Sequence, residues 1–195
     1  MHRGVANVFI DLFGAVTQRL EAKRIVSRKI LSEYRPMQFD GVEIIILSPS
    51  ESVSGAFNKA LAERLASKQG NLPDANNLSA ILAIKYGDAL VVLGGDALKK
   101  SWEQAVTLHR SETLPKASLL KIPHHGASNA LSIHPRPKES TYLDICSREP
   151  KANAVLFAGR SNHPNKEVYD KLRERTTLYC LSNGLKRTSN PLNLT

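Results

Sequence analysis

Apolar residues recur along the chain at two periods, one typical of helices and one typical of strands. Over residues 5–32 the apolar positions fall at steps of four and three, at Val5, Phe9, Leu12, Val16 and Leu20. This spacing predicts an amphipathic helical region. A similar stripe predicts a second helix with Ser52 as its expected N-cap, and consists of Val53, Phe57, Leu61 and Leu65.

Six short apolar runs, each bounded by turn residues, predict strands. They cover residues 42–47, 78–85, 89–93, 118–122, 153–158 and 178–181. Tyr86-Gly87-Asp88 joins the second and third runs, which predicts a β-hairpin. Further helices are expected after Asp96 and from Pro164, a residue that suits the first turn of a helix. The pattern therefore predicts an α/β protein of the α+β type.

Length and composition indicate one globular domain, with at most a small arm. The chain has 195 residues, of which 42% are hydrophobic and 23% are charged. Its two cysteines, Cys146 and Cys180, lack CxxC spacing and are too few for a disulfide-rich secreted scaffold. No apolar run approaches the roughly 20 residues of a membrane helix, and no signal-type stretch follows Met1. We therefore expect a cytoplasmic protein without a membrane segment.

The chain is strongly basic. Lys and Arg number 27 against 18 Asp and Glu, which gives a formal net charge of +9. This balance favours polyanionic partners such as nucleic acid. The basic residues are spread along the sequence, however, with clusters at 19–29 and 171–175. A solvated basic surface without a specific partner is the alternative interpretation.

Polar clusters that can carry chemistry follow three of the predicted strands. Asp96 follows residues 89–93, His124-His125 follows 118–122, and His163 follows 153–158. Strand ends in α/β proteins present side chains from a rigid scaffold. Carboxylate and imidazole together are the ligands of zinc, manganese or iron, and such an ion makes hydroxide near neutral pH. The set indicates a hydrolase.

Each of these residues also has a simpler interpretation. Asp96 in a Gly-Asp sequence is often a turn residue or a helix cap, and His163-Pro164 can merely begin a helix. Two adjacent imidazoles rarely serve packing, so His124-His125 is the most informative signal. The other histidines, His2, His109 and His134, are expected to be ordinary surface or helix residues.

The order of these motifs resembles the metallo-β-lactamase superfamily, and in particular the hydrolase-like domain of ComEC competence proteins. The resemblance covers residues 40–185 and is carried by Leu93-Gly94-Gly95-Asp96, by Pro123-His124-His125-Gly126 and by Asn162-His163-Pro164. It implies an αββα sandwich with a metal centre at one edge. The domain would span residues 36–185, with an N-terminal helical arm over 1–35 and a flexible tail over 186–195.

The resemblance also implies roles for individual residues. Asp96, His124, His125 and His163 match metal ligands of the family, and a divalent metal, zinc first and manganese or iron next, is the implied cofactor. Asp96 and His125 would be the catalytic residues. Asn162 and Ser128 are candidates for substrate binding. The sequence leaves open which of His124 and His125 touches the metal, and whether His163 is a ligand or a substrate contact.

One departure from the family matters. Its His-x-His-x-Asp-His motif has no counterpart, since His2 is the only histidine before His109. The domain is therefore expected to be incomplete at its N-terminus. Half of a two-sheet sandwich leaves an apolar face and unpaired sheet edges, and a homodimer or a complementing N-terminal half chain would cover them.

Three functions follow as hypotheses. The first is a metal-dependent hydrolase acting on phosphodiesters or nucleic acid, which a basic surface would attract. The second is a truncated, non-catalytic accessory half that binds a partner chain or nucleic acid. The third is a basic globular domain whose histidines are incidental.

Overall fold

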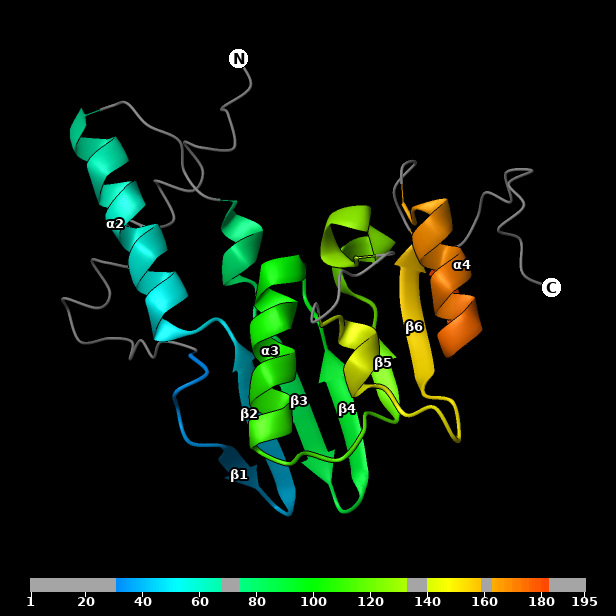
Figure 1. Ribbon diagram of the computed structural model, residues 1–195. Helices are drawn as coiled ribbons and strands as arrows, with labels where there is room; N and C mark the ends of the chain where they lie inside the picture. Colours follow the sequence, from blue (N-terminus) through cyan, green and yellow to red (C-terminus); the bar gives the residue numbers. More distant parts are fainter. Residues whose placement is uncertain (1–30, 68–73, 133–139, 159–162, 183–195) are drawn as a thin grey trace.

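The computed structural model describes residues 31–67, 74–132, 140–158 and 163–182. Within these ranges seven strands form one mixed sheet, accompanied by three α-helices (Figure 1). The strands are β1 (Met37–Phe39), β2 (Val42–Ser48), β3 (Ile81–Tyr86), β4 (Ala89–Leu93), β5 (Leu119–Lys121), β6 (Asn153–Ala158) and β7 (Thr177–Ser182). The helices are α2 (Glu51–Ser67), α3 (Lys99–Ser111) and α4 (Lys166–Arg175), and the 3₁₀ turns are η1 (Ala75–Leu78), η2 (Pro123–Gly126), η3 (Ser128–Ala130) and η4 (Tyr142–Ile145).

The sheet changes from antiparallel to parallel at β4. Its strand order follows the chain, β1 to β7. The pairs from β1 to β4 are antiparallel, whereas β4, β5, β6 and β7 run parallel to one another. Parallel neighbours bring their carboxyl ends to the same edge of a sheet. The loops that follow β4, β5 and β6 therefore share one edge.

All six predicted strands are present, and β1 is an additional strand that the sequence pattern did not predict. This strand has three exposed residues, and polar Gln38 in its middle leaves no apolar run in the sequence. Asp40 and Gly41 join it to β2 with φ of 46° and 80°. A two-residue hairpin turn of this type requires positive φ at both positions, and Asp-Gly is a favoured sequence for it. The Asp40-Gly41 dipeptide was therefore the one sequence signal that could have revealed β1.

Helix α2 forms as predicted but packs differently. No residue of α2 is buried, and Leu65 is 69% exposed. Figure 1 shows the helix extending away from the sheet. Its N-terminus is satisfied by the Glu33 carboxylate, which accepts from the Glu51 amide at 2.9 and 3.0 Å, and by Ser50, rather than by Ser52. The apolar stripe of α2 is thus only partly covered, since Val53, Phe57 and Leu61 are partly buried and Leu65 is exposed.

The core lies on one face of the sheet, beneath α3, η4 and α4. Trp102 of α3 and Tyr142 of η4 are fully buried, and their rings meet edge to face at a centroid distance of 5.3 Å. The sheet contributes every second residue to this face, as the period of a strand requires. These residues are Ile45, Leu47, Ile81, Ala83, Leu90, Val92, Leu120, Ala154 and Leu156.

The opposite face of the sheet, here called the bare face, is also apolar. None of its side chains belongs to the core cluster, and they follow from the strand register: Ile44, Ile46, Leu82, Ile84, Val91, Leu93, Leu119, Val155, Phe157, Tyr179 and Leu181. Ile46, at the β2 end of this face, is buried. Phe157, Tyr179 and Leu181 are between 42% and 52% exposed. Lys121 shares this face, with its ammonium group 5.9 Å from the Phe157 ring centroid.

The predicted helical arm and tail fall largely outside the described residues. Of the arm, only 31–35 are described, and residues 32–33 form a turn, so the expected helix does not continue to 32. Leu31 is buried at 4% exposure. Residues 186–195 lie outside the description. Among the helices that are described, none is long and apolar enough to cross a membrane.

Candidate metal centre

The sheet topology brings the sequence-predicted ligands to one edge. Asp96 lies in the turn after β4, His124 and His125 lie in η2 after β5, and His163 follows β6. Because these three strands are parallel neighbours, their carboxyl ends meet at this edge. Chain segments nearly 70 residues apart therefore contribute to a single site, as expected of strand ends in α/β proteins.

Backbone hydrogen bonds join the three loops. The His124 amide donates to the carbonyl of Gly95 at 3.0 Å, and the Asn165 amide donates to the carbonyl of Gly126 at 3.0 Å. The first bond links the loops after β4 and β5, and the second links the loops after β5 and β6. A shift in one loop is therefore transmitted to its neighbour.

The histidine loop has an unusual backbone. His124 and His125 have φ of 45° and 54°, in the left-handed region, and Gly126 follows with φ of 76°. A left-handed conformation costs an ordinary residue roughly 1–2 kcal/mol. A Cβ on Gly126 would lie 2.8 Å from Pro164 Cβ and 3.2 Å from Leu156 Cδ1. Strain that is concentrated on two adjacent imidazoles is typical of a functional loop.

His125 is oriented by the backbone of β6. Its Nδ1 lies 3.0 Å from the carbonyl oxygen of Phe157. Because a carbonyl only accepts, this bond places the proton on Nδ1. Metal-binding histidines are commonly fixed by the same kind of bond, which leaves Nε2 as the coordinating atom.

Asp96 lies opposite that nitrogen. Its Oδ1 is 3.9 Å from His125 Nε2, and the two side chains are 47% and 29% exposed. With the imidazole neutral, a lone pair faces a carboxylate oxygen, and both atoms are acceptors. A proton or a cation placed between Asp96 Oδ1 and His125 Nε2 would interact favourably with both atoms. Asp96 does not cap α3, whose N-cap is Leu98, so its carboxylate is available for this role.

His124 and His163 form a second pair. Their ring centroids are 6.0 Å apart and their planes are inclined by 45°. His124 Nδ1 is buried, and among the described residues it has no hydrogen-bond partner. A buried nitrogen without a partner is costly, and such an atom calls for an explanation. A ligand at this edge would supply one.

The donor set fits a divalent ion in part. Zinc binds imidazole nitrogen and carboxylate oxygen at about 2.0–2.2 Å, so two atoms 3.9 Å apart are within reach of one ion. Asp96 and His125 can therefore hold a metal together. Over the described ranges, however, no three His, Cys, Asp or Glu side chains come close enough to share an ion. A catalytic zinc commonly has three protein ligands, so the described residues supply only part of a ligand set.

The two substrate-binding candidates and the other histidines are not part of these two pairs. Ser128 is exposed in η3, beyond the histidine loop. Asn162, His2 and His134 lie outside the described residues. His109 is in α3 as expected, but it is buried at 3% exposure, and its Nε2 donates to the carbonyl of Pro115 at 2.9 Å. The expectation of a helix residue is confirmed, and the burial of His109 is satisfied because Nε2 finds its partner inside the protein.

Sequence reasoning missed the contribution of Phe157. Its backbone carbonyl holds His125, and no side-chain pattern can reveal a carbonyl partner. Gly126 was visible as part of the Pro-His-His-Gly motif, but its close contact with Pro164 depends on the fold.

Comparison with known proteins adds no assignment to this geometry. A scan against protein-family models finds no match for the chain, and a search of curated proteins finds none either.

Proposed function

We propose that the protein is a metal-dependent hydrolase of the metallo-β-lactamase type, acting on phosphodiesters. The observation that carries the proposal is the pairing of Asp96 with His125. Their two acceptor atoms are 3.9 Å apart, and the carbonyl of Phe157 orients the imidazole. A divalent ion bound there would lower the pKa of a coordinated water and polarise a phosphoryl oxygen. Zinc is the expected ion, with manganese or iron as alternatives.

The two faces of the sheet support the αββα sandwich that we propose. Helices α3 and α4 cover one face, whereas the bare face carries exposed Phe157, Tyr179 and Leu181. Monomeric proteins rarely leave large contiguous apolar patches exposed. A second sheet packed on the bare face would bury these side chains, as in two-sheet sandwiches.

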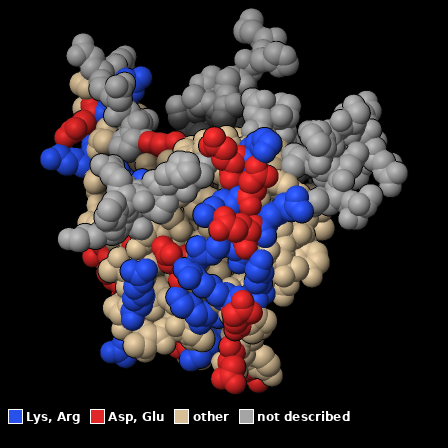
Figure 2. All heavy atoms as spheres, turned by 45° about the vertical axis from the view of Figure 1, so that its right-hand side comes forward, with Lys and Arg blue, Asp and Glu red and all other residues tan. Residues whose placement is uncertain are grey.

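Positive charge supports a phosphodiester substrate. Lys99 and Lys100 begin α3 just after Asp96, and Lys121 ends β5 just before the histidine loop. The whole chain has a net charge of +9. Figure 2 shows many Lys and Arg side chains on the side of the molecule that is at the right in Figure 1, with Asp and Glu between them. Such a surface attracts a phosphate backbone over a range set by ionic strength.

A second candidate function is that of a non-catalytic accessory chain which binds a partner. Two observations favour it. The described residues bring two ligands, and not three, to a common point. The bare face also offers an apolar surface of the kind that a partner chain covers. The sequence agrees, since the His-x-His-x-Asp-His motif is absent from it.

Metal content tests the site on which the hydrolase proposal rests. The protein is purified without chelators, and bound zinc, manganese and iron are measured per chain for the wild type, Asp96→Ala and Asp88→Ala. Asp88 is an exposed acid of the β3–β4 turn and is the matched control. We expect close to one ion per chain in the wild type and in Asp88→Ala, and loss of the ion in Asp96→Ala. Equal metal content in all three proteins would contradict the site.

Activity is then tested on DNA, RNA and a simple phosphodiester. The hydrolase proposal requires metal-dependent cleavage that EDTA removes and that Asp96→Ala and His125→Ala lack. A protein that binds metal but cleaves none of these substrates would favour the accessory function.

A further inference from the structure

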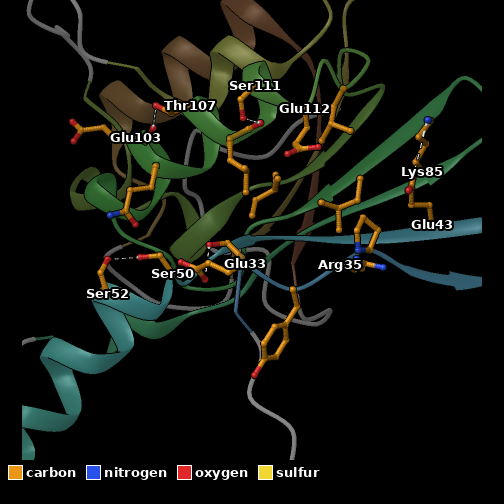
Figure 3. Close-up of a pocket in the computed structure, with 18 of the residues that line it drawn as sticks. Glu33, Arg35, Glu43, Ser50, Ser52, Lys85, Glu103, Thr107, Ser111 and Glu112 are labelled. Carbon is orange, nitrogen blue, oxygen red and sulfur yellow. Dashed lines mark hydrogen bonds and ion pairs between the residues drawn. The ribbon is translucent and has the colours of Figure 1, made fainter.

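The two edges of the sheet differ in how well they are protected against the addition of another strand. At one edge, β1 has three residues and directly follows Pro36, and both features hinder further pairing. Charged side chains gather beside it: Arg35, Glu43 and Lys85 line a pocket over β2, and Figure 3 shows them at one end of that pocket. Short edge strands with charged surroundings are a common protection of sheets.

The opposite edge, formed by β7, lacks these features. Strand β7 is twice as long as β1 and contains no proline, lysine, arginine or acidic residue. Over the described residues, no strand pairs with its outer side. Two of its apolar side chains, Tyr179 and Leu181, are 52% and 49% exposed. An edge of this kind is a template for a further strand.

The ladder between β6 and β7 shows which backbone groups of β7 are left unpaired. The Thr177 amide donates to the carbonyl of Ala152 at 3.0 Å, so the backbone groups of Thr177 face β6. The direction of these groups alternates from one residue to the next along a strand. Leu178, Cys180 and Ser182 therefore point their N–H and C=O groups to the outer side of β7, where the described residues supply no strand to bind them.

We propose that β7 pairs antiparallel with β7 of a second copy of this chain, across a two-fold axis at Cys180. This register puts Cys180 opposite its own counterpart, and Leu178 opposite Ser182 of the partner subunit. Residues opposed in this way exchange two backbone hydrogen bonds, so each outward N–H and C=O group gains a partner. The joint extends the sheet and leaves the bare face open, so it is independent of the proposed function.

The side chains of β7 favour a second copy as the partner. In this register Tyr179 lies opposite Leu181 of the partner subunit on the bare face, and the two-fold axis repeats the contact. Cross-strand pairs of an aromatic and an aliphatic residue stabilise a sheet. Because β7 carries no charged residue, its two copies bring no like charges together. The exposed side chains of the edge thus cover one another in an isologous contact.

Sedimentation of the full chain over a roughly hundredfold range of concentration tests the pairing. We expect a species with twice the 21.5 kDa mass of one chain. Cys180→Pro removes an outward N–H that the β6–β7 ladder does not use, whereas Cys180→Ala keeps it. The proline should raise the dissociation constant of the dimer at least about tenfold, and the alanine should leave it within about twofold. Equal dissociation constants, or a monomer at every concentration, would overturn the proposal.

A second pair of variants distinguishes the β7 edge from the bare face. Leu181→Lys puts a charge into the joint, whereas Tyr86→Lys puts one on β3, where Tyr86 is 66% exposed on the bare face. Both positions are exposed, so neither substitution should unfold the chain. Leu181→Lys should weaken the dimer at least about tenfold, and Tyr86→Lys should leave it within about twofold. A dimer that Tyr86→Lys weakens as much as Leu181→Lys would be built through the bare face, which would overturn the proposal.

Amide hydrogen exchange reports on the edge directly. In the dimer the Leu178 and Cys180 amides donate to the partner, so their exchange should be at least about tenfold slower at high than at low protein concentration. Protection that is equal at both concentrations would mean that the chain's own residues cover the edge, and it would overturn the proposal.

Discussion

Gly126 is a glycine at which a single added methyl group should damage the candidate metal centre. Alanine at this position keeps the left-handed φ of 76°, which costs roughly 1–2 kcal/mol. The new Cβ would also lie 2.8 Å from Pro164 Cβ and 3.2 Å from Leu156 Cδ1. Pro164 is a rigid ring and Leu156 is fully buried, so neither can yield cheaply. Overpacking of this kind costs about 1–3 kcal/mol, which brings the loss of stability to about 2–5 kcal/mol.

Gly87 is the matched control. It lies in the β3–β4 turn with φ of 55°, and a Cβ there would meet nothing within 4 Å. Gly87→Ala therefore has the left-handed cost alone, and both variants share the same gain from a less flexible unfolded chain. The difference between them, about 1–3 kcal/mol, isolates the steric contact with Pro164. For a chain of this size it corresponds to roughly 2–12 °C in the midpoint of thermal unfolding.

The assay is urea unfolding followed by circular dichroism, with the metal content of each folded variant measured alongside. We expect Gly126→Ala to unfold at clearly lower urea than Gly87→Ala with the same denaturant slope, and to bind less metal, because Pro164 adjoins His163. Unfolding free energies that agree within about 0.5 kcal/mol would refute the argument. In that case Pro164 and its loop would be free to move aside.

Three further predictions concern other parts of the molecule. Burial lowers the pKa of His109 below its usual 6.5, so the unfolded state takes up a proton at a higher pH than the folded state does. The free energy of unfolding should therefore fall as pH decreases through about 6.5. His109→Gln should make this pH dependence weaker in urea midpoints measured between pH 5 and 8. Burial raises the pKa of Cys146 to about 12, so an aromatic disulfide reagent should leave Cys146 unmodified in the folded protein and modify it after unfolding. Half-buried Cys180 should react slowly in the folded protein and quickly after unfolding. A thiol count of two in the folded protein at early times would contradict this. Gly55→Ala, at an open position inside α2, should stabilise that helix by about 0.5–1 kcal/mol. Amide hydrogen exchange in α2 should then be roughly two- to fivefold slower. Unchanged exchange would argue that α2 does not open independently of the rest of the protein.

Local patterns were sufficient to predict most of the elements. The strands β2 to β7 each contain an apolar run, and a run of that kind favours extended backbone wherever it lies in the fold. Strand β1 has no such run, because it has only three residues and polar Gln38 separates Met37 from Phe39. The stripe of α2 predicted the helix correctly but not its surroundings, since packing depends on contacts that the sequence of the helix does not contain.

The order and direction of the strands were beyond the sequence pattern. A hairpin turn reveals that β3 and β4 are antiparallel, because the connection is only two residues long. The connections from β4 to β7 are longer, and their parallel pairing follows from how α3, η4 and α4 pack on the sheet. Non-local packing of this kind has no signature in a short window of residues.

The candidate site was predictable in position but not in arrangement. Strand ends placed Asp96, His124, His125 and His163 at one edge. The structure divides them into two pairs, Asp96 with His125 and His124 with His163. That division depends on left-handed backbone at two adjacent histidines and on the carbonyl of Phe157, and neither is visible in residue types or spacing.

Phe157 links the incomplete ligand set to the bare face of the sheet. Its carbonyl orients His125, whereas its ring is 42% exposed on the bare face beside Lys121. Any layer that packs on this face would therefore contact the side chain of the residue whose carbonyl orients His125. Under the proposed function, such a layer would both bury the apolar side chains and bring further carboxylates or imidazoles to Asp96 and His125. Covering the face and completing the coordination would then be one event, so a layer bound there should raise metal affinity and stability together.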